Sequence, residues 1–427
     1  MVSVIPRAAV APLVAILMAS VLSQSMAEPM IGASDPRGEL TLAAAIDAAL
    51  SRNPDLQSAV YELRAADARI TQARVRPNPE LDFTAENFAG TGSAHGTSLL
   101  ESTLSLGQVI ELGGKQERRL EVATSERDAA AIERDARQLD VLAEVTRRFL
   151  QVVSAQEQLL LARRASDLAV QTAAVIGARV EAARSPEAEE SRARIAVVRA
   201  RVEQQRAERE LQIARRALAA TWGSTEPLFE TASADLYARP VVVSFESLEQ
   251  RLERNPELLR FASEARLREA QLRLARAEAV PSLTLSAGLR HLNETDDTAV
   301  VAGFSLPLHV FDRRQGAIGE AEARHAQALA AQQAGVIRVS TTLFELYQGL
   351  EQAGSEAAAL HAEAIPQAEA ALAQSREGYE RGRFSYLELA TAQQELIELR
   401  RAEIEAAAKY HDFLTEIERL TNEPLTR

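Results

Sequence analysis

The sequence of this 427-residue chain repeats itself, and this duplication restricts the possible folds more than any other feature. The run Leu50–Leu56, which reads LSRNPDL, recurs 202 positions later as Leu252–Leu258, which reads LERNPEL. Further on, LSL at 104–106 recurs as FSL at 304–306, at an offset of 200. Several matches in one order at nearly one spacing indicate two copies of one structural plan. We therefore predict a first repeat at 28–224, a linker at 225–243 and a second repeat at 244–427.

Each repeat opens with a helical segment and closes with a much longer helical tract. The tract that begins at residue 115 contains no proline before Pro186, and its apolar residues recur at helical spacings. At 1.5 Å per residue, such a helix approaches ~100 Å. Aromatic residues make up only 4% of the chain, which favours long helices coiled against each other over compact globular cores. We expect two helical hairpins, one turning at Pro186 and one at Gly382, with Pro366 as an additional break.

Between the helices of each repeat lie two segments with the alternation of β-strands. In the second repeat, apolar and polar residues alternate at 283–289 and again at 300–310. The first repeat has counterparts at 81–85 and 100–110, separated by a glycine-rich turn. The predicted fold class is therefore mainly α with a small β part, in which long helical hairpins carry four strands per chain.

The N-terminus has the three parts of a secretory signal peptide. Arg7 precedes the apolar run at 8–22, and Ser25-Met26-Ala27 provides a cleavage site of small residues. The run is too short to cross a membrane comfortably, since a spanning helix needs ~20 apolar residues. We therefore predict a signal peptide at 1–27 rather than an anchor helix, and a mature chain exported beyond the inner membrane.

An exported chain with alternating strands of this length fits an outer-membrane barrel. Four strands cannot form one alone, because open edges in lipid leave backbone groups unsatisfied at several kcal/mol each, and spanning barrels have at least ~8 strands. Other copies of the chain must then complete the barrel, and two, three or four copies would all give an even number of strands. The opposing interpretation is a soluble helical protein with two short hairpins, which leaves the signal peptide and the duplication as coincidences.

Several classes of function are disfavoured by the composition. The chain has no cysteine, which excludes disulfides, thiolate metal sites and cysteine nucleophiles. Its formal net charge of −13 argues against nucleic acid as a partner. The six histidines show no metal-ligand spacing, and no catalytic constellation stands out. We therefore expect no enzyme activity, no cofactor and no resident metal.

Three motifs resemble those of the outer-membrane efflux proteins of the TolC superfamily. Val109–Lys115 (VIELGGK) is similar to the turn from the second strand into the long helix of that family, and Val310–Gly316 (VFDRRQG) is similar to its second copy. Tyr379–Leu389 (YERGRFSYLEL) resembles the second periplasmic tip. The ELGGK and FDR sequences look most like the heavy-metal, cobalt–zinc–cadmium branch.

This resemblance implies a homotrimer with a twelve-stranded β-barrel in the outer membrane and an α-barrel across the periplasm. It implies a periplasmic adaptor and a proton-driven inner-membrane RND pump as partners, outer-membrane lipid around the barrel, and heavy-metal cations as the exported substrate. A duct for organic drugs or for type I protein secretion is an alternative of the same class. An alternative of another class is a periplasmic adaptor or scaffold, although adaptors usually carry one helical hairpin flanked by β-rich domains.

The resemblance assigns the second hairpin turn to the periplasmic tip, where the adaptor docks. Gly382 permits a tight turn between helices, and Ser385 can cap the returning helix. The apolar side chains of Phe384 and Leu387 suit contacts between a helix and a groove. The residues predicted to form the tip and dock the adaptor are Arg381, Gly382, Arg383, Phe384, Ser385, Leu387 and Pro186.

Glu388 falls where family members carry a carboxylate that faces the lumen at the periplasmic constriction. Some relatives have a second acid three residues further on, where this chain has Thr391, so a double acidic ring is not expected. The first tip is more acidic and adds Glu189 and Glu190 as candidates for the constriction. The alternative for each of these glutamates is an ordinary solvated helix face.

The turns from strand to helix form the last predicted site. Glycine at Gly113 and Gly114 would allow backbone angles that other residues avoid. A phosphate-binding loop is excluded because the required glycine and lysine spacing is absent. The residues predicted to form the two strand-to-helix turns are Gly113, Gly114, Asp312, Arg313 and Gly316.

Overall fold

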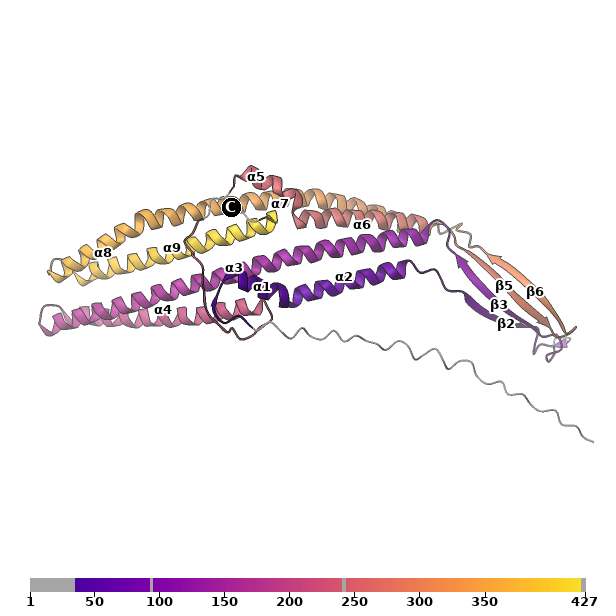
Figure 1. Ribbon diagram of the computed structural model, residues 1–427, viewed down its shortest axis with the longest axis horizontal. Helices are drawn as coiled ribbons and strands as arrows, with labels where there is room; N and C mark the ends of the chain where they lie inside the picture. The colour runs from indigo at the N-terminus through magenta and orange to yellow at the C-terminus, as the bar shows by residue number, and fades with distance from the viewer. Residues whose placement is uncertain (1–34, 93–94, 240–242, 424–427) are drawn as a thin grey trace, which may run out of the picture. The chain divides into compact units, whose positions relative to one another are not determined.

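The computed structural model describes residues 35–92, 95–239 and 243–423 (Figure 1). The predicted signal peptide at 1–27 lies outside the described residues. The first repeat contains α1 (Leu42–Arg52), α2 (Pro54–Ala73), β2 (Glu80–Glu86), β3 (Glu101–Ile110), α3 (Lys115–Glu181) and α4 (Glu187–Ala220). The second contains α5 (Phe245–Arg251), α6 (Pro256–Glu278), β5 (Leu283–Leu292), β6 (Asp297–Ser305), α7 (Gln315–Ala359), α8 (Ile365–Glu380) and α9 (Tyr386–Thr421). Two further short strands are β1 (Gly38–Leu40) and β4 (Phe229–Ala232).

The long helical tract of the first repeat is continuous, whereas that of the second is locally distorted. Helix α3 runs unbroken for 67 residues. In the second repeat a π-helical segment, Leu360–Ala364, joins α7 to α8 just before Pro366. Proline has no amide hydrogen and its ring clashes with the carbonyl of the preceding turn, and the wider π-turn accommodates both effects. The predicted break at Pro366 is therefore a distortion within one long helical path.

In each repeat, one asparagine connects the start of an early helix to the end of the last helix. The side-chain oxygen of Asn53 accepts hydrogen bonds from the first amides of α2, and that of Asn255 accepts one from Leu258 of α6. The side-chain nitrogen of Asn53 donates to the carbonyl of Thr221 at 2.8 Å, and that of Asn255 donates to Leu420 at 2.6 Å. The repeated Asn-Pro sequence thus starts one helix and holds the end of the last helix of its own repeat.

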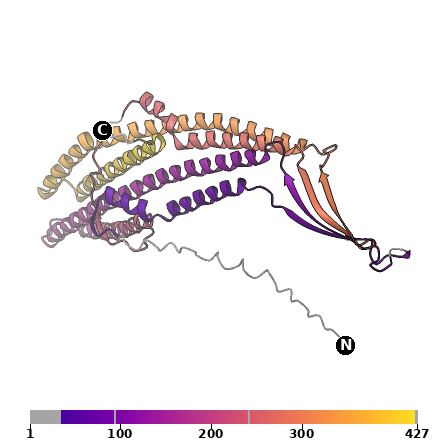
Figure 2. The same ribbon diagram turned by 45° about the vertical axis from the view of Figure 1, so that its right-hand side comes forward.

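The helices lie side by side in the order α2, α3, α6 and α7, and hairpins of α3 with α4 and of α8 with α9 extend away from the sheet (Figures 1 and 2). The largest apolar core joins α1, the middle of α3, the end of α4 and the segment after it. Phe149 of α3 is fully buried there, beside Trp222 and Phe229. The predicted linker at 225–243 contributes to this core, because β4 pairs in parallel with β1.

The four longer strands form one antiparallel sheet in the order β2-β3-β5-β6. The central pair, β3 with β5, joins the two repeats over ten consecutive residue pairs, from Glu101 with Leu292 to Ile110 with Leu283. The register places apolar residues on one face and polar residues on the other. The apolar face includes Leu81, Phe83, Ala85, Leu104, Leu106, Ile110, Leu283, Leu285, Ala287, Leu289, Val300, Ala302 and Phe304, and it also carries the polar residues Ser102, Gln108, His291 and Thr298. The polar face includes Asp82, Thr84, Glu86, Glu101, Thr103, Ser105, Ser286 and Arg290.

One strand is shorter than the sequence indicates. The alternating pattern predicts a strand over 300–310, but β6 ends at Ser305. Pro307 has no amide to donate, and pairing of β5 with β6 stops at Thr284 with Ser305. The apolar residues beyond it remain exposed, with Leu308 at 76% and Phe311 at 93%.

Replacing Asn255 tests the connection between the ends of a repeat. Asn255→Ala removes a helix cap and leaves the buried carbonyl of Leu420 without its donor, so we expect a loss of about 2–3 kcal/mol. Thr41→Ala removes a cap at an exposed site and should cost no more than about 1 kcal/mol. Thermal unfolding of the detergent-solubilised protein should show the larger decrease in melting temperature for Asn255→Ala. Equal decreases would contradict the role of Asn255 as the donor that holds the Leu420 carbonyl.

Candidate functional site

The tips of the two helical hairpins lie at the opposite end of residues 35–423 from the sheet (Figures 1 and 2). Both turns use a residue with left-handed backbone, Gly382 at φ +71° and Ala183 at φ +54°. In each turn an amide just beyond that residue returns to the last turn of the helix, from Arg383 to the carbonyl of Gly378 and from Arg184 to that of Arg179. The predicted turn at Gly382 is thus present, and Ala183 adopts the same conformation without glycine, at a cost of about 1–2 kcal/mol.

Arg179 of the first hairpin connects the two tips. Its guanidinium donates to the backbone carbonyls of Tyr379 and Glu380, both at 3.2 Å, and lies 4.8 Å from the centre of the Tyr379 ring. These carbonyls belong to the end of α8, where a positive charge is favoured by the helix dipole. Below this contact the apolar side chains of both tips form one small core, made of Ile176, Ala193, Tyr379, Tyr386 and Leu389.

Each of the three predicted constriction carboxylates has a partner within the chain. Glu388 accepts from the backbone amide of Ser385 at 2.6 Å, which completes a capping box at the start of α9. Glu189 accepts from the hydroxyl of Tyr379 at 3.2 Å, and Glu190 forms an ion pair with Arg194. Burial is the main reason that the pKa of Tyr379 is raised, with Glu189 acting in the same direction. The hydroxyl therefore remains a donor to Glu189 at neutral pH.

The predicted docking residues of the second hairpin are exposed at its tip, and Pro186 lies in the turn of the first hairpin. Leu387 is 63% exposed and Phe384 is 43% exposed, and the Phe384 ring lies against Gly378. A side chain at Gly378 would place its Cβ 2.3 Å from the Phe384 ring, so only glycine lets the ring fold over the hairpin. Arg383 and Pro186 are also exposed, and Arg381 pairs with Glu377. Apolar side chains and positive charge thus lie together on this surface.

The first strand-to-helix turn contacts the second repeat. Gly113 has φ +74°, and a Cβ there would lie 2.8 Å from Val280, so both the backbone angle and the space require glycine. Gly114, at φ +70°, caps α3, and the Lys115 ammonium donates to the Ser282 hydroxyl at 2.7 Å. Glu111 forms two hydrogen bonds with Arg119, which lowers the pKa of the Glu111 carboxyl.

The corresponding turn in the second repeat uses different residues from those predicted. The left-handed position is Arg314, at φ +57°, and not a glycine. The Asp312 side chain stabilises it by accepting from the Arg314 amide at 2.8 Å. Arg313 is exposed, and Gly316 lies in the first turn of α7 with nothing near the position of a Cβ. Asp312 and Arg314 form the turn itself and Gly316 follows it within α7, so a role of Gly316 in this turn remains a prediction.

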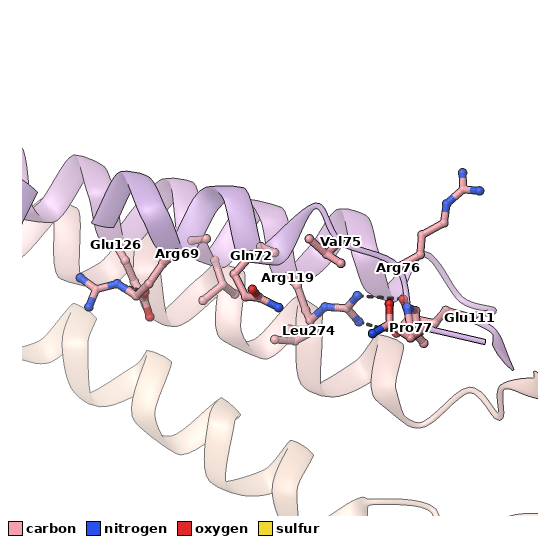
Figure 3. A pocket seen from close by; sticks show the side chains of 13 residues that line it. Arg69, Gln72, Val75, Arg76, Pro77, Glu111, Arg119, Glu126 and Leu274 are labelled. Carbon is pink, nitrogen blue, oxygen red and sulfur yellow. Dashed lines mark hydrogen bonds and ion pairs between the residues drawn. The ribbon is translucent and has the colours of Figure 1, made fainter. Parts of the chain in front are cut away.

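A cavity of about 670 Å³ lies beside the first of these turns, between α2 and α3 (Figure 3). Arg119 and Glu111 meet at one end of it, and Arg69 lies beside Glu126 at the other, with 3.5 Å between the charged groups. Arg76 extends away from the other labelled side chains. Both carboxylates of the lining are therefore already paired with arginine.

Sequence reasoning missed Arg179, Tyr379 and the Arg119–Glu111 pair. Arg179 lies 200 residues from Tyr379, and one arginine in an Arg-rich helix carries no local signal. Glu111 lies within the recognised VIELGGK motif and Arg119 lies just after it, eight residues further on. The sequence does not reveal that their side chains meet across the turn. Among the described residues, no group of three or more histidine and acidic side chains is arranged to hold a metal ion.

A sheet with one exposed apolar face, attached to long helical hairpins, is the architecture of a channel protein that inserts its strands into a membrane. Comparison with known proteins agrees. The chain matches the family model described as "Outer membrane efflux protein" over residues 45–224 and 247–423. It therefore belongs to the outer membrane efflux protein family, as an efflux channel of the outer membrane with a periplasmic extension and not an enzyme.

The chain is similar in sequence to two named resistance proteins and similar in fold to two solved structures. Cobalt-zinc-cadmium resistance protein CzcC of Cupriavidus metallidurans is 32% identical over 90% of each chain. Nickel-cobalt-cadmium resistance protein NccC of Alcaligenes xylosoxydans xylosoxydans is 26% identical over 73% of this chain and 68% of its own length. The solved outer membrane protein VceC of Vibrio cholerae has a TM-score of 0.73 at 19% identity, covering 90% of this chain and 96% of its own. CusC has a TM-score of 0.75 at 18% identity, covering 89% and 91%.

In the part of the chain that the structure describes, no helix has both the length and the apolar character needed to cross a membrane. Family membership excludes the alternative of a periplasmic adaptor.

Removing Arg179 tests the connection between the tips. Arg179→Gln should lose both bonds to α8 and the contact with the Tyr379 ring, about 1–2 kcal/mol in all. Amide hydrogen exchange at residues 379–384 should then become roughly tenfold faster, while the core around Phe149 stays unchanged. Arg383→Gln, an exposed change on the same tip, is the matched control and should leave exchange as it is. Similar exchange in both variants would show that Arg179 does not hold the tips together.

Proposed function

We propose that this chain is the outer-membrane duct of a tripartite, proton-driven efflux system that exports heavy-metal cations. The observation that carries the proposal is the similarity to CzcC, which is 32% identical over 90% of each chain and is named for cobalt, zinc and cadmium resistance. NccC is named for resistance to nickel, cobalt and cadmium. The domain boundaries given by the sequence, with repeats at 28–224 and 244–427, remain a prediction within this proposal.

The assembled duct would be a homotrimer. The sheet has two open edges, β2 and β6, and an exposed apolar face on which Val300 is 79% and Phe304 is 77% exposed. In lipid the apolar face is favourable, but the backbone groups of the open edges are not. Three copies of four strands give a closed barrel of twelve strands, with the polar face towards a water-filled lumen.

The hairpin tips would dock the periplasmic adaptor, which in turn contacts the inner-membrane RND pump. The exposed side chains of Phe384 and Leu387 beside Arg383 support this assignment, because apolar anchors on a helix suit docking into a groove of a partner. The pump selects the substrate, and the duct provides a path for it.

Labelling of single cysteines tests which end of the duct faces the outside of the cell. The chain has no cysteine of its own that could react with the reagent. Thr295 lies in the exposed turn between β5 and β6, and Ser385 lies at the helical tip. An impermeant thiol reagent added to intact cells should label Thr295→Cys and not Ser385→Cys. Equal labelling of both would contradict the proposed orientation.

Charge at the constriction is tested with Glu388→Gln. Three converging carboxylates concentrate cations where the duct is narrowest, so the variant should show reduced cation selectivity and weaker block by divalent ions in planar bilayers. Glutamine can replace glutamate in a capping box, so the start of α9 should survive. Ser385→Ala is the matched control, because it weakens the cap and keeps the charge. Unchanged selectivity in Glu388→Gln would assign Glu388 to capping alone.

A further inference from the structure

The sheet and the helices beside it end at the same two edges. Strands follow the order β2-β3-β5-β6, and the neighbouring helices follow the order α2, α3, α6 and α7. One edge is thus formed by β2 with α2 and the other by β6 with α7. Apolar side chains are exposed along both, including Phe83 at 67%, Tyr61 at 59%, Leu308 at 76% and Ile337 at 70%.

In the middle of the same layer, the two repeats already meet edge to edge within one chain. There β3 and α3 of the first repeat pair with β5 and α6 of the second. By the duplication, β3 corresponds to β6, and β5 corresponds to β2. The boundary inside the chain is therefore a template for the boundary between one copy and the next.

The observed strand pairs confirm the alignment that this template needs. Pro79 corresponds to Pro281 at an offset of 202, and LSL at 104–106 corresponds to FSL at an offset of 200. Leu81 pairs with Leu106 in the first hairpin. Adding 202 to the first number and 200 to the second gives the corresponding residues of the second hairpin, 283 and 306. The observed pair of Leu285 with Phe304 belongs to that same register. The two hairpins therefore superpose without a shift.

We infer that residues 306–310 form a strand with residues 81–85 of the next copy, in the register copied from β3 and β5. The inference rests on the proposed trimer and specifies how it closes. Within the chain, Ile110 pairs with Leu283 and Gln108 with Leu285. The copied pairs are Val310 with Leu81, Leu308 with Phe83 and Leu306 with Ala85 of the next copy.

The chemistry of both faces agrees with this register. The three copied pairs are apolar and lie on the apolar face of the sheet. On the polar face, His309 lies opposite Asp82 of the next copy, between the first two of these pairs, and Ser305 lies opposite Glu86, just beyond the third. A shift by one residue would move every apolar side chain to the polar face.

The same register explains why β6 stops at Ser305 in the single chain. Pairing of β2 with β3 ends at Glu80 with Gly107, and the last residues of β3, up to Ile110, are paired by β5 alone. The corresponding residues, up to Val310, have their partner in the next copy. The alternation that the sequence shows over 300–310 then becomes one continuous strand.

Pro307 is compatible with this strand. The amide of Asn293 donates to the carbonyl of Leu100 at 2.9 Å, so even-numbered residues of β3 direct their backbone groups towards β5. By correspondence, even-numbered residues of 306–310 bond to the next copy, and odd-numbered residues face their own β5. The missing amide of Pro307 therefore removes no hydrogen bond between copies.

Disulfide formation between copies tests the register. Asp82 and His309 form a non-hydrogen-bonded pair, for which the Cα separation is about 4.5 Å and a disulfide is allowed. Asp82→Cys with His309→Cys in one chain should, after mild oxidation in membranes, convert most of the protein into a covalent trimer that reductant reverses. Thr84→Cys with His309→Cys is the matched control, because its diagonal separation of roughly 7–8 Å prevents a disulfide. Each single variant should remain a monomer on a denaturing gel.

The outcomes separate the register from the trimer. Cross-linking in the control pair in place of the test pair would overturn the register and retain closure by β2 and β6. A native trimer that cross-links in neither pair, nor in Phe83→Cys with Leu308→Cys, would overturn the inferred boundary altogether. Absence of a trimer in the unmodified protein on a native gel would instead overturn the proposed function.

Discussion

Antiparallel pairing of β3 with β5 is the interaction on which the rest of the structure depends. It joins the two repeats through ten residue pairs and places α3 beside α6, so that sheet and helices continue as one layer. It also fixes which face of every strand is apolar, because the side chains of paired residues point the same way. The layer can extend in both directions from this boundary, and the exposed backbone of β2 and β6 gives it a physical reason to do so.

Most of the fold could be predicted from the sequence because duplication, strand alternation and helix caps are local signals. The Asn-Pro sequence was visible as part of the duplication, and the turn at Gly382 follows from residue type alone. The second role of Asn53 and Asn255, which is to hold the far end of the repeat, was not visible because it depends on contacts more than 160 residues away. The pairing of β1 with β4 escaped for the same reason: three- and four-residue strands carry too little alternation to be recognised.

The candidate site was predicted less completely, because its geometry depends on how two hairpins meet. The sequence indicated the residues of the second tip, and the exposed positions of Phe384 and Leu387 are compatible with docking. It did not indicate that Glu388, Glu189 and Glu190 each have a partner in the same chain. A capped or hydrogen-bonded carboxylate still carries its charge, so these contacts position the candidates for a constriction without removing them.

The helical hairpins of the two repeats differ in form. Helix α3 is continuous to Glu181, whereas its counterpart contains the π-helical segment before Pro366 and ends at a glycine turn. Arg179 of the first hairpin bonds to the backbone of the second and lies against the Tyr379 ring. These contacts lie beside the small apolar core that the two tips share. A hydrogen bond of that kind contributes only about 0.5–1.5 kcal/mol, so the connection between the tips also depends on burial of the apolar side chains of both hairpins.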